Sequence, residues 1–250
     1  MYQPIVSPAY PRAPITEAVI QLRMAADVEA KALEKIQNKL KAAYPETQPL
    51  QKFEVKVDQT GGQVNVAHNQ QGFRLANADQ TDIVILDARN LTVARLAPYP
   101  GWEHLRDRAN SAWQRWKAET PRHPIERIGV RFINRIDIPV MDDDSIAISN
   151  YLNFCPYAAP ITDAAMLNFL LRVTVPTYDP QWIANITTTT LGATQVPKHH
   201  SLILDIDIFR TAEIPIRDDL LWPIIDAARL IKNDLFERCI TAATRNLFSP

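Results

Sequence analysis

The sequence predicts an α+β protein made of two tandem related halves, each an antiparallel sheet with the element order strand, helix, strands and helix. Three observations lead to this prediction: a repeated Pro-Arg-x-Pro-Ile lead-in, runs of adjacent strands, and an apolar helical stretch that closes each half. Runs of strands without helices between them favour an antiparallel α+β architecture over a doubly wound parallel sheet. The length allows one or two domains with a sizeable core.

The repeated lead-in covers residues 11–15 and 121–125, where Pro-Arg-Ala-Pro-Ile and Pro-Arg-His-Pro-Ile each precede an apolar-rich stretch. Proline holds the chain extended and disfavours helix in the residue before it, so each copy predicts a stiff approach to a strand. We therefore expect a first α+β half at residues 1–120 and a second at 121–250, or one continuous domain that contains both. By analogy alone, the order resembles helix-grip or TBP-like units, in which a curved sheet holds a long helix.

In the first half, alternating apolar positions from Ala18 to Met24 predict a strand, and Asp27 is the expected N-cap of the helix that follows. A closing helix is expected from Trp102 to Lys117, and we interpret the tryptophans on its apolar stripe as core residues. The strands and turns expected between the two helices are 53–57, 64–68, 73–76, 83–86 and 91–96, with turns at Gly61-Gly62 and Arg89-Asn90.

The second half repeats this order, beginning with a strand at 127–138. Acidic residues before Ser145 favour a short helix through the helix dipole. The later runs are rich in β-branched and aromatic residues, which are typical of strands. The expected elements are the helix 145–153, the strands 167–175, 182–190 and 201–209, and a final helical stretch at 220–247.

The candidate site lies on the polar sides of strands in the second half. An arginine recurs at every fourth position of strand 127–138, and two aspartates alternate with apolar residues in strand 201–209. Guanidinium groups bind phosphates and carboxylates in a bidentate manner, so this arrangement predicts an anionic-ligand or partner face. The alternative is an internal lattice in which the arginines pair with the acids. The candidate face comprises Arg127, Arg131, Arg135, Arg172, Asp205 and Asp207.

Composition excludes several classes of protein. With 46% hydrophobic residues, 22% charged residues and a net charge of −1, the chain matches an ordinary globular protein and not a polybasic nucleic-acid platform. The six glycines do not cluster into a phosphate loop or a dinucleotide fingerprint, so we expect no cofactor. Cys155 and Cys239 lack the spacing of a disulfide framework or metal site. No segment has the length of a membrane span, and we expect a cytoplasmic protein.

Two segments carry a resemblance to a known family: Pro-Ile-Thr-Glu-Ala-Val-Ile-Gln-Leu-Arg at 14–23 and Arg-Ile-Gly-Val-Arg-Phe-Ile-Asn-Arg-Ile at 127–136. Together with blocks at 204–209 and 232–236, they resemble a sporadically distributed prokaryotic family of about this length. Its members open with a Pro-Ile-x-Glu-Ala-Val-Ile strand and carry an Arg-Ile-Gly-x-Arg-(Tyr/Phe)-Ile-Asn strand, and here Phe132 stands where tyrosine is common. The resemblance implies architecture over nearly the whole chain, assigns no activity, and suggests mobile or defence-linked genes.

These features predict a non-enzymatic binding or interaction protein, an accessory component of a prokaryotic, defence-linked assembly. The expected partner is another protein or a second copy of the chain. One alternative is a metal-dependent enzyme acting on nucleic acid or a phosphorylated small molecule, with Asp205, Asp207 and Glu17 as ligands. Another is a small-molecule-binding protein with a pocket between sheet and helix.

Overall fold

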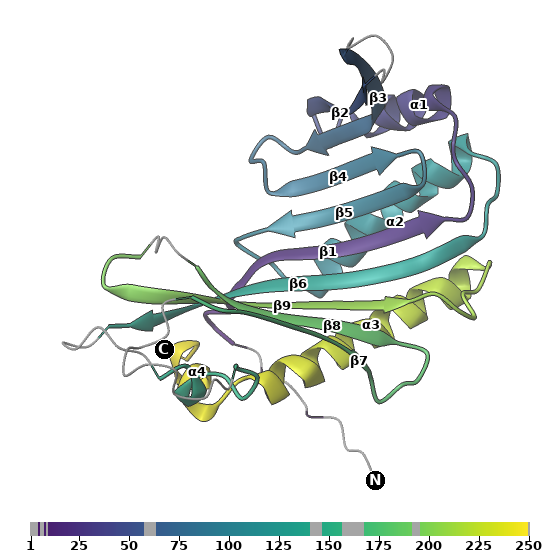
Figure 1. Cartoon of the computed structure of the whole chain (residues 1–250). Coiled ribbons are helices and arrows are strands. Elements are labelled where there is room, and N and C mark those ends of the chain that lie inside the picture. Colours follow the sequence, from purple (N-terminus) through teal and green to yellow (C-terminus); the bar gives the residue numbers. More distant parts are fainter. Residues whose placement is uncertain are drawn as a thin grey trace. The chain divides into compact units, whose positions relative to one another are not determined.

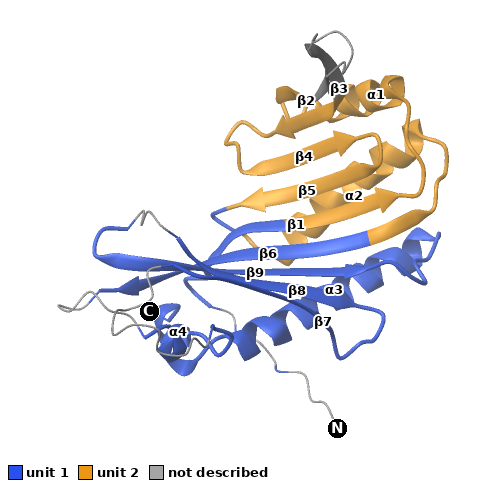
Figure 2. Ribbon diagram, viewed as in Figure 1, with its two compact units in different colours: residues 1–18, 97–99, 128–250 blue, residues 19–96, 100–127 orange. Residues whose placement is uncertain are grey.

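The computed structural model describes residues 5, 8, 10–57, 64–140, 147–156, 168–191 and 196–249, except for the side chains of 51–57 and 64–70. The protein is α+β, with a nine-stranded antiparallel sheet in the order β2-β3-β4-β5-β1-β6-β9-β8-β7 (Figure 1). This confirms the predicted class and the antiparallel pairing. The chain forms two compact units, unit 1 at 1–18, 97–99 and 128–250, and unit 2 at 19–96 and 100–127 (Figure 2).

Unit 2 contains most of β1 (Ile15–Met24) and two helices that pack together, α1 (Ala30–Leu40) and α2 (Trp102–Glu119). Apolar side chains at alternating positions of β1 are buried, as the sequence pattern predicts. The tryptophans of α2 are at most 6% exposed, which confirms their interpretation as core residues. The remaining strands of the unit are β2 (Glu46–Val57), β3 (Val64–Ala76), β4 (Asp82–Asp87) and β5 (Asn90–Leu96).

Four predicted details of unit 2 are wrong. The expected strand 53–57 is the last part of a longer strand, β2, because residues 46–52 also pair with β3. The expected strands 64–68 and 73–76 are one strand, β3, because an irregularity at Gln71 lets pairing with β2 continue. The N-cap of α1 is Glu29 rather than Asp27, whose carboxylate lies 3.4 Å from Arg89 Nε. The turn after β4 ends one residue earlier than expected, because Asp87 Oδ1 accepts hydrogen bonds from the backbone of Arg89 and Asn90. The expected Gly61-Gly62 turn lies outside the described residues.

Unit 1 contains most of β6 (Ile125–Pro139) and a long helix, α3 (Asp218–Cys239). Antiparallel ladders join β6 to β9, β9 to β8 and β8 to β7. In β6, β8 and β9 every second side chain is buried along most of the strand, which is the period-two pattern that the sequence predicts. The other elements are β7 (Leu170–Pro176), β8 (Ile183–Leu191), β9 (His199–Arg210), the short 3-10 helix η1 (Ile148–Asn150) and α4 (Ala242–Leu247).

Two helical predictions in unit 1 need correction. The expected helix 145–153 is described from residue 147 onward, and there it contains only the short helix η1. The expected helical stretch 220–247 contains two helices with a break between them, because Ile240 adopts extended backbone geometry and forms a β-bridge with Leu152. Thr241 then restarts the helix by accepting a hydrogen bond from the backbone N–H of Thr244. Of the helices in the described residues, none is both long and apolar enough to cross a membrane.

The core of unit 1 lies between α3 and one face of strands β6, β9 and β8. Lys232 Nζ of α3 lies 4.0 Å from the ring centroid of Phe132, which places the helix against the face that carries Phe132 (Figure 1). The buried residues Val130, Ile206 and Ile208 share this face. We call the opposite side of the four unit 1 strands, which faces away from α3, the open face.

Candidate functional site

The open face brings together most of the arginines and aspartates singled out in the sequence. Residues directly opposite each other in antiparallel strands point to the same side of a sheet. Arg131 on β6 lies opposite Asp207 on β9, and Asp205 on β9 lies opposite Thr187 on β8. Thr187 in turn lies opposite Arg172 on β7. A continuous polar band therefore crosses all four strands of unit 1.

The strongest contact in this band is a bidentate ion pair. Arg131 Nε donates to Asp205 Oδ1 over 2.8 Å, and Arg131 Nη2 donates to Asp205 Oδ2 over 2.6 Å. The hydrogen bonds that Arg131 donates to Asp205 raise the pKa of Arg131, and the nearby carboxylates of Asp207 and Glu17 act in the same direction. With a side chain that is still 47% exposed, Arg131 presents part of its guanidinium group to solvent. The pair fixes the orientation of both groups.

Neutral side chains continue the band towards β7. Asn185 Nδ2 donates to Asp207 Oδ2 over 3.3 Å, and Thr174 Oγ1 donates to Asn185 Oδ1 over 2.8 Å. This chain of contacts connects the carboxylate of β9 with the outermost strand of the unit. The band thus offers hydrogen-bonding groups that are already oriented by their neighbours.

Arg135 has a different environment from Arg131. Its Nε lies 3.1 Å from Asp137 Oδ2 on the same strand, and the other oxygen of Asp137 accepts a hydrogen bond from Ser201 Oγ over 2.6 Å. Arg135 and Asp137 also line a cavity of about 290 Å³, to which Arg12 and Phe248 contribute. These contacts fit the predicted alternative in which arginines pair with acids.

Arg127, the first arginine of the row, lies in unit 2, where its Nη1 donates to Gln21 Oε1 over 2.8 Å. The arginine row at every fourth position of β6 is therefore a feature of the sequence that the two compact units divide between them. Arg131, Arg135, Arg172, Asp205 and Asp207 remain as the members found in unit 1.

Apolar side chains interleave with the polar band on the open face. Ile133 lies opposite Asp205, and Ile203 lies opposite Arg135. Phe209 and Ile183 lie opposite each other on β9 and β8. All four are half-buried, in contrast to the fully buried residues on the α3 side of the same strands. The face is therefore a mixture of apolar, hydrogen-bonding and charged groups.

The predicted metal ligands do not form a metal site. Within the described part of the chain, which includes Glu17, Asp205 and Asp207, no three residues of the types His, Cys, Asp and Glu are grouped to hold an ion. Both oxygens of Asp205 already accept hydrogen bonds from Arg131. A cation at this position would have to displace a bidentate guanidinium group.

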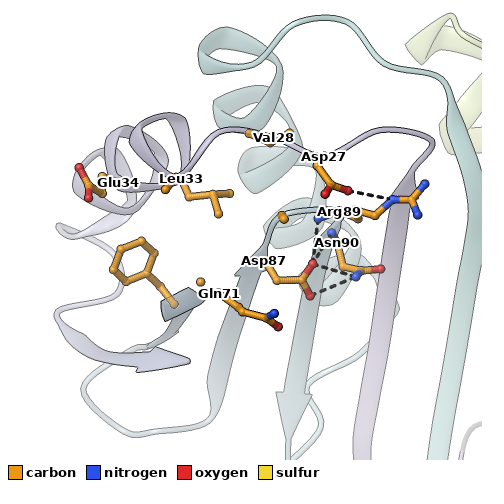
Figure 3. A pocket seen from close by; sticks show the side chains of 12 residues that line it. Asp27, Val28, Leu33, Glu34, Gln71, Asp87, Arg89 and Asn90 are labelled. Carbon is orange, nitrogen blue, oxygen red and sulfur yellow. Dashed lines mark hydrogen bonds and ion pairs between the residues drawn. The ribbon is translucent and has the colours of Figure 1, made fainter. Parts of the chain in front are cut away.

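A separate pocket of about 500 Å³ lies in unit 2, between the start of α1, β3 and the turn after β4 (Figure 3). Its walls combine Leu33 and Phe73 with polar groups such as Glu34 and Gln71. Arg89 closes one end, where its Nη2 donates to the backbone oxygen of Ala25 over 2.6 Å. The volume lies within the usual range for small-molecule sites.

No protein-family model matches the chain, and no curated protein matches it. The family resemblance and the function accordingly stay predictions.

Sequence reasoning missed a set of buried charged groups on α3. Lys232 is 6% exposed, Glu237 is 2% exposed and Asp234 is fully buried. Asp234 Oδ2 lies 2.9 Å from Arg238 Nε, and Glu237 Oε2 lies 2.8 Å from Arg245 Nε. The helical spacing could have indicated the burial of Lys232, because this residue lies four residues after Ala228 and four before Phe236, within the apolar stripe of the helix.

Proposed function

We propose that this chain is a non-enzymatic binding protein and that the open face of unit 1 binds a partner protein. The observation that carries the proposal is the composition of that face, where half-buried Ile203 and Phe209 alternate with the oriented polar groups of Asp205 and Asp207. Protein interfaces are enriched in aromatic residues and arginine. They form about one hydrogen bond per 100–200 Å² of interface area. Preoriented groups lose less conformational freedom on binding, which favours affinity.

The charge of the face supports a protein partner over a nucleic acid. The arginines of the unit 1 band are balanced by carboxylates from Glu17, Asp137, Asp205 and Asp207. Binding to nucleic acid draws much of its affinity from cationic contacts to phosphates, which a balanced face does not provide. Charge pairs of both signs instead favour specificity for one complementary protein surface.

A substitution in the centre of the band tests the proposal. Thr187→Arg adds bulk and charge on the open face between Asp205 and Arg172 and leaves the α3 side unchanged. We expect a partner purified from the native host with the wild-type protein to bind this variant at least about tenfold more weakly, since blocked central contacts dominate interface energies. Isothermal titration calorimetry with the purified partner provides the measurement.

Asn38→Arg serves as the matched control, because it adds the same side chain at an exposed position of α1 in unit 2. The control variant should bind like the wild type. A partner that binds Thr187→Arg with unchanged affinity would refute the assignment of the open face. An enzymatic activity abolished in the Asp205→Asn, Asp207→Asn double variant would refute the non-enzymatic assignment.

We further propose that the two halves arose by internal duplication, as the repeated lead-in suggests. The order of the sheet supports this, because β1 lies beside β5, the last strand of the first half, and β6 lies beside β9, the last strand of the second. A cytoplasmic location and an accessory role in a prokaryotic assembly belong to the same proposal. The resemblance to a sporadically distributed prokaryotic family supports them.

A second candidate function is small-molecule binding in the unit 2 pocket, which its volume of about 500 Å³ favours. Ala30 lies at the rim of this pocket and is exposed, so Ala30→Trp should fill the space without disturbing the core. We expect a ligand found by thermal-shift screening to raise the Tm of the wild type and to leave the Tm of Ala30→Trp unchanged. A ligand that stabilises both proteins equally binds elsewhere.

A further inference from the structure

Strand β7 ends the sheet on the unit 1 side. Among the described strands it pairs with β8 alone, in a register that runs from Leu170 opposite Thr189 to Pro176 opposite Ile183. A strand in this position presents backbone N–H and C=O groups along its outer edge, which another strand can pair with. The open question is which chain has the complementary groups.

The hydrogen bonds at the two ends of the β7–β8 ladder show which backbone groups point outward. Thr177 N–H donates to Trp182 O over 3.1 Å, and Thr190 N–H donates to Phe169 O over 3.4 Å. Residues of an antiparallel strand alternate between pointing their backbone groups towards and away from one neighbour. The odd-numbered residues of β7 therefore point theirs towards β8. The even-numbered Leu170, Arg172 and Thr174 point theirs away from it.

The side chains of β7 leave apolar surface uncovered. Val173 and Val175 are half-buried, although their neighbours Ile186 and Ala184 on β8 are buried on the same side of the sheet. On the opposite side, Leu170 is 73% exposed. A strand added next to β7 would cover both sets. Natural edge strands often carry inward-pointing charges or prolines against such pairing, and β7 has proline only at its last residue.

We propose that β7 pairs with β7 of a second copy of this chain, antiparallel and about a two-fold axis at Val173. In this register Arg172 lies opposite Thr174 of the second copy. Because both residues point their backbone groups outward, they exchange two hydrogen bonds, and the symmetry repeats this pair. Leu170 N–H meets the carbonyl of Pro176 of the second copy, and this end pair forms one hydrogen bond instead of two, because proline has no N–H to donate to the Leu170 carbonyl.

The charge of Arg172 and the length of the paired segment favour this register over those with the axis at Arg172 or Thr174. An axis at Arg172 would place two arginines directly opposite each other, which is unfavourable. An axis at Thr174 would leave Leu170 without an opposite residue in β7 of the second copy. The axis at Val173 avoids the arginine contact and pairs the whole strand from Leu170 to Pro176. The sequence of β7 is thus complementary to itself, and a second copy is the partner that always carries it.

This association extends the proposed function without depending on it. Antiparallel pairing about an axis perpendicular to the sheet keeps the α3 side of both copies on one side. The two open faces then lie next to each other on the opposite side, and a dimer would offer a partner two equivalent binding surfaces. Binding of a bivalent partner would gain from their proximity.

Sedimentation of the purified full-length chain over a wide range of concentrations tests the proposal. We expect a reversible monomer–dimer equilibrium in the wild type. Arg172→Pro removes an outward N–H from each copy and should weaken the dimer at least about tenfold, since it deletes hydrogen bonds and brings ring atoms into the interface. Arg172→Ala keeps the N–H and is the matched control, with a dimer close to that of the wild type. Circular dichroism and Tm confirm that both variants fold.

Charge variants at Thr174 test the register. Thr174→Glu places a carboxylate opposite Arg172 of the second copy, twice per dimer, and should tighten the dimer several-fold. Thr174→Arg places like charges opposite each other and should weaken it by a similar factor. A wild type that remains monomeric at all concentrations would overturn the proposal, as would a dimer that is indifferent to Arg172→Pro. Equal effects of Thr174→Glu and Thr174→Arg would overturn the register. Loss of partner binding in Thr187→Arg with an intact dimer would separate the two proposals.

Discussion

Gly72→Ala is expected to lower the free energy of unfolding by about 3 kcal/mol, because β3 has no space for a side chain at this position. A Cβ added to Gly72 would overlap the backbone carbonyl oxygen of Leu86 and approach the Asp87 Cα to 2.9 Å. Both are backbone atoms of β4, which lies beside β3, so no side-chain rotation can relieve the contact. The strands must separate or the local register must change.

Chemical denaturation of the full-length protein, followed by circular dichroism, measures this loss. The control is Gln71→Ala, which truncates the exposed residue beside Gly72 and should change stability by no more than about 0.5 kcal/mol. Equal stability of Gly72→Ala and the wild type would mean that β3 and β4 do not approach each other as closely as described. Because the unit 2 pocket is lined by Gln71, Gly72 and Phe73, the same variant should also weaken any ligand of that pocket.

The element types were predictable because they rest on local periodicity. Alternation from Ala18 to Met24 and the helical stripe of α2 both appear in the structure at the expected positions. Boundaries were less predictable where a tertiary contact decides them. The break after Cys239 depends on a bridge between Ile240 and Leu152, and nothing in the helical pattern of residues 220–247 indicates that contact.

The sequence predicts which residues of the candidate site lie on the same side of the sheet, but it does not predict which side chains pair with each other. Period-two alternation correctly places Asp205 and Asp207 on one side of β9, because side-chain direction in a strand is a local property. The partner of Arg131 is Asp205 rather than the directly opposite Asp207, a choice that depends on strand twist and side-chain reach.

Lys232→Met is expected to stabilise the protein at neutral and mildly acidic pH, by an amount that shrinks as the pH rises. Burial lowers the pKa of Lys232 to about 7, and the charge of Arg229 adds to this effect while Glu237 opposes it. Below that pH the folded protein holds a buried ammonium group. Its contacts are the rings of Phe132 at 4.0 Å and Phe236 at 5.9 Å, and cation–π attraction returns only part of the lost hydration energy.

The pH dependence follows from proton binding. In the unfolded chain the lysine keeps a pKa near 10.5, so above about pH 7 the unfolded state binds more protons than the folded state. The stability of the wild type relative to Lys232→Met should therefore rise by up to about 1.4 kcal/mol per pH unit over this range. The raised pKa values of Tyr10 and Cys239, both about 12, affect the wild type and the variant alike and cancel in the difference.

Urea denaturation of both proteins between about pH 6 and about pH 8.5 measures this difference directly. Lys31→Met is the control, since Lys31 is exposed on α1 and its removal should give a difference that does not vary with pH. A constant difference for Lys232→Met would mean that the amine reaches solvent and titrates as in the unfolded chain. If the difference in the free energy of unfolding falls towards zero as the pH rises, the folded protein holds Lys232 most favourably in its neutral form.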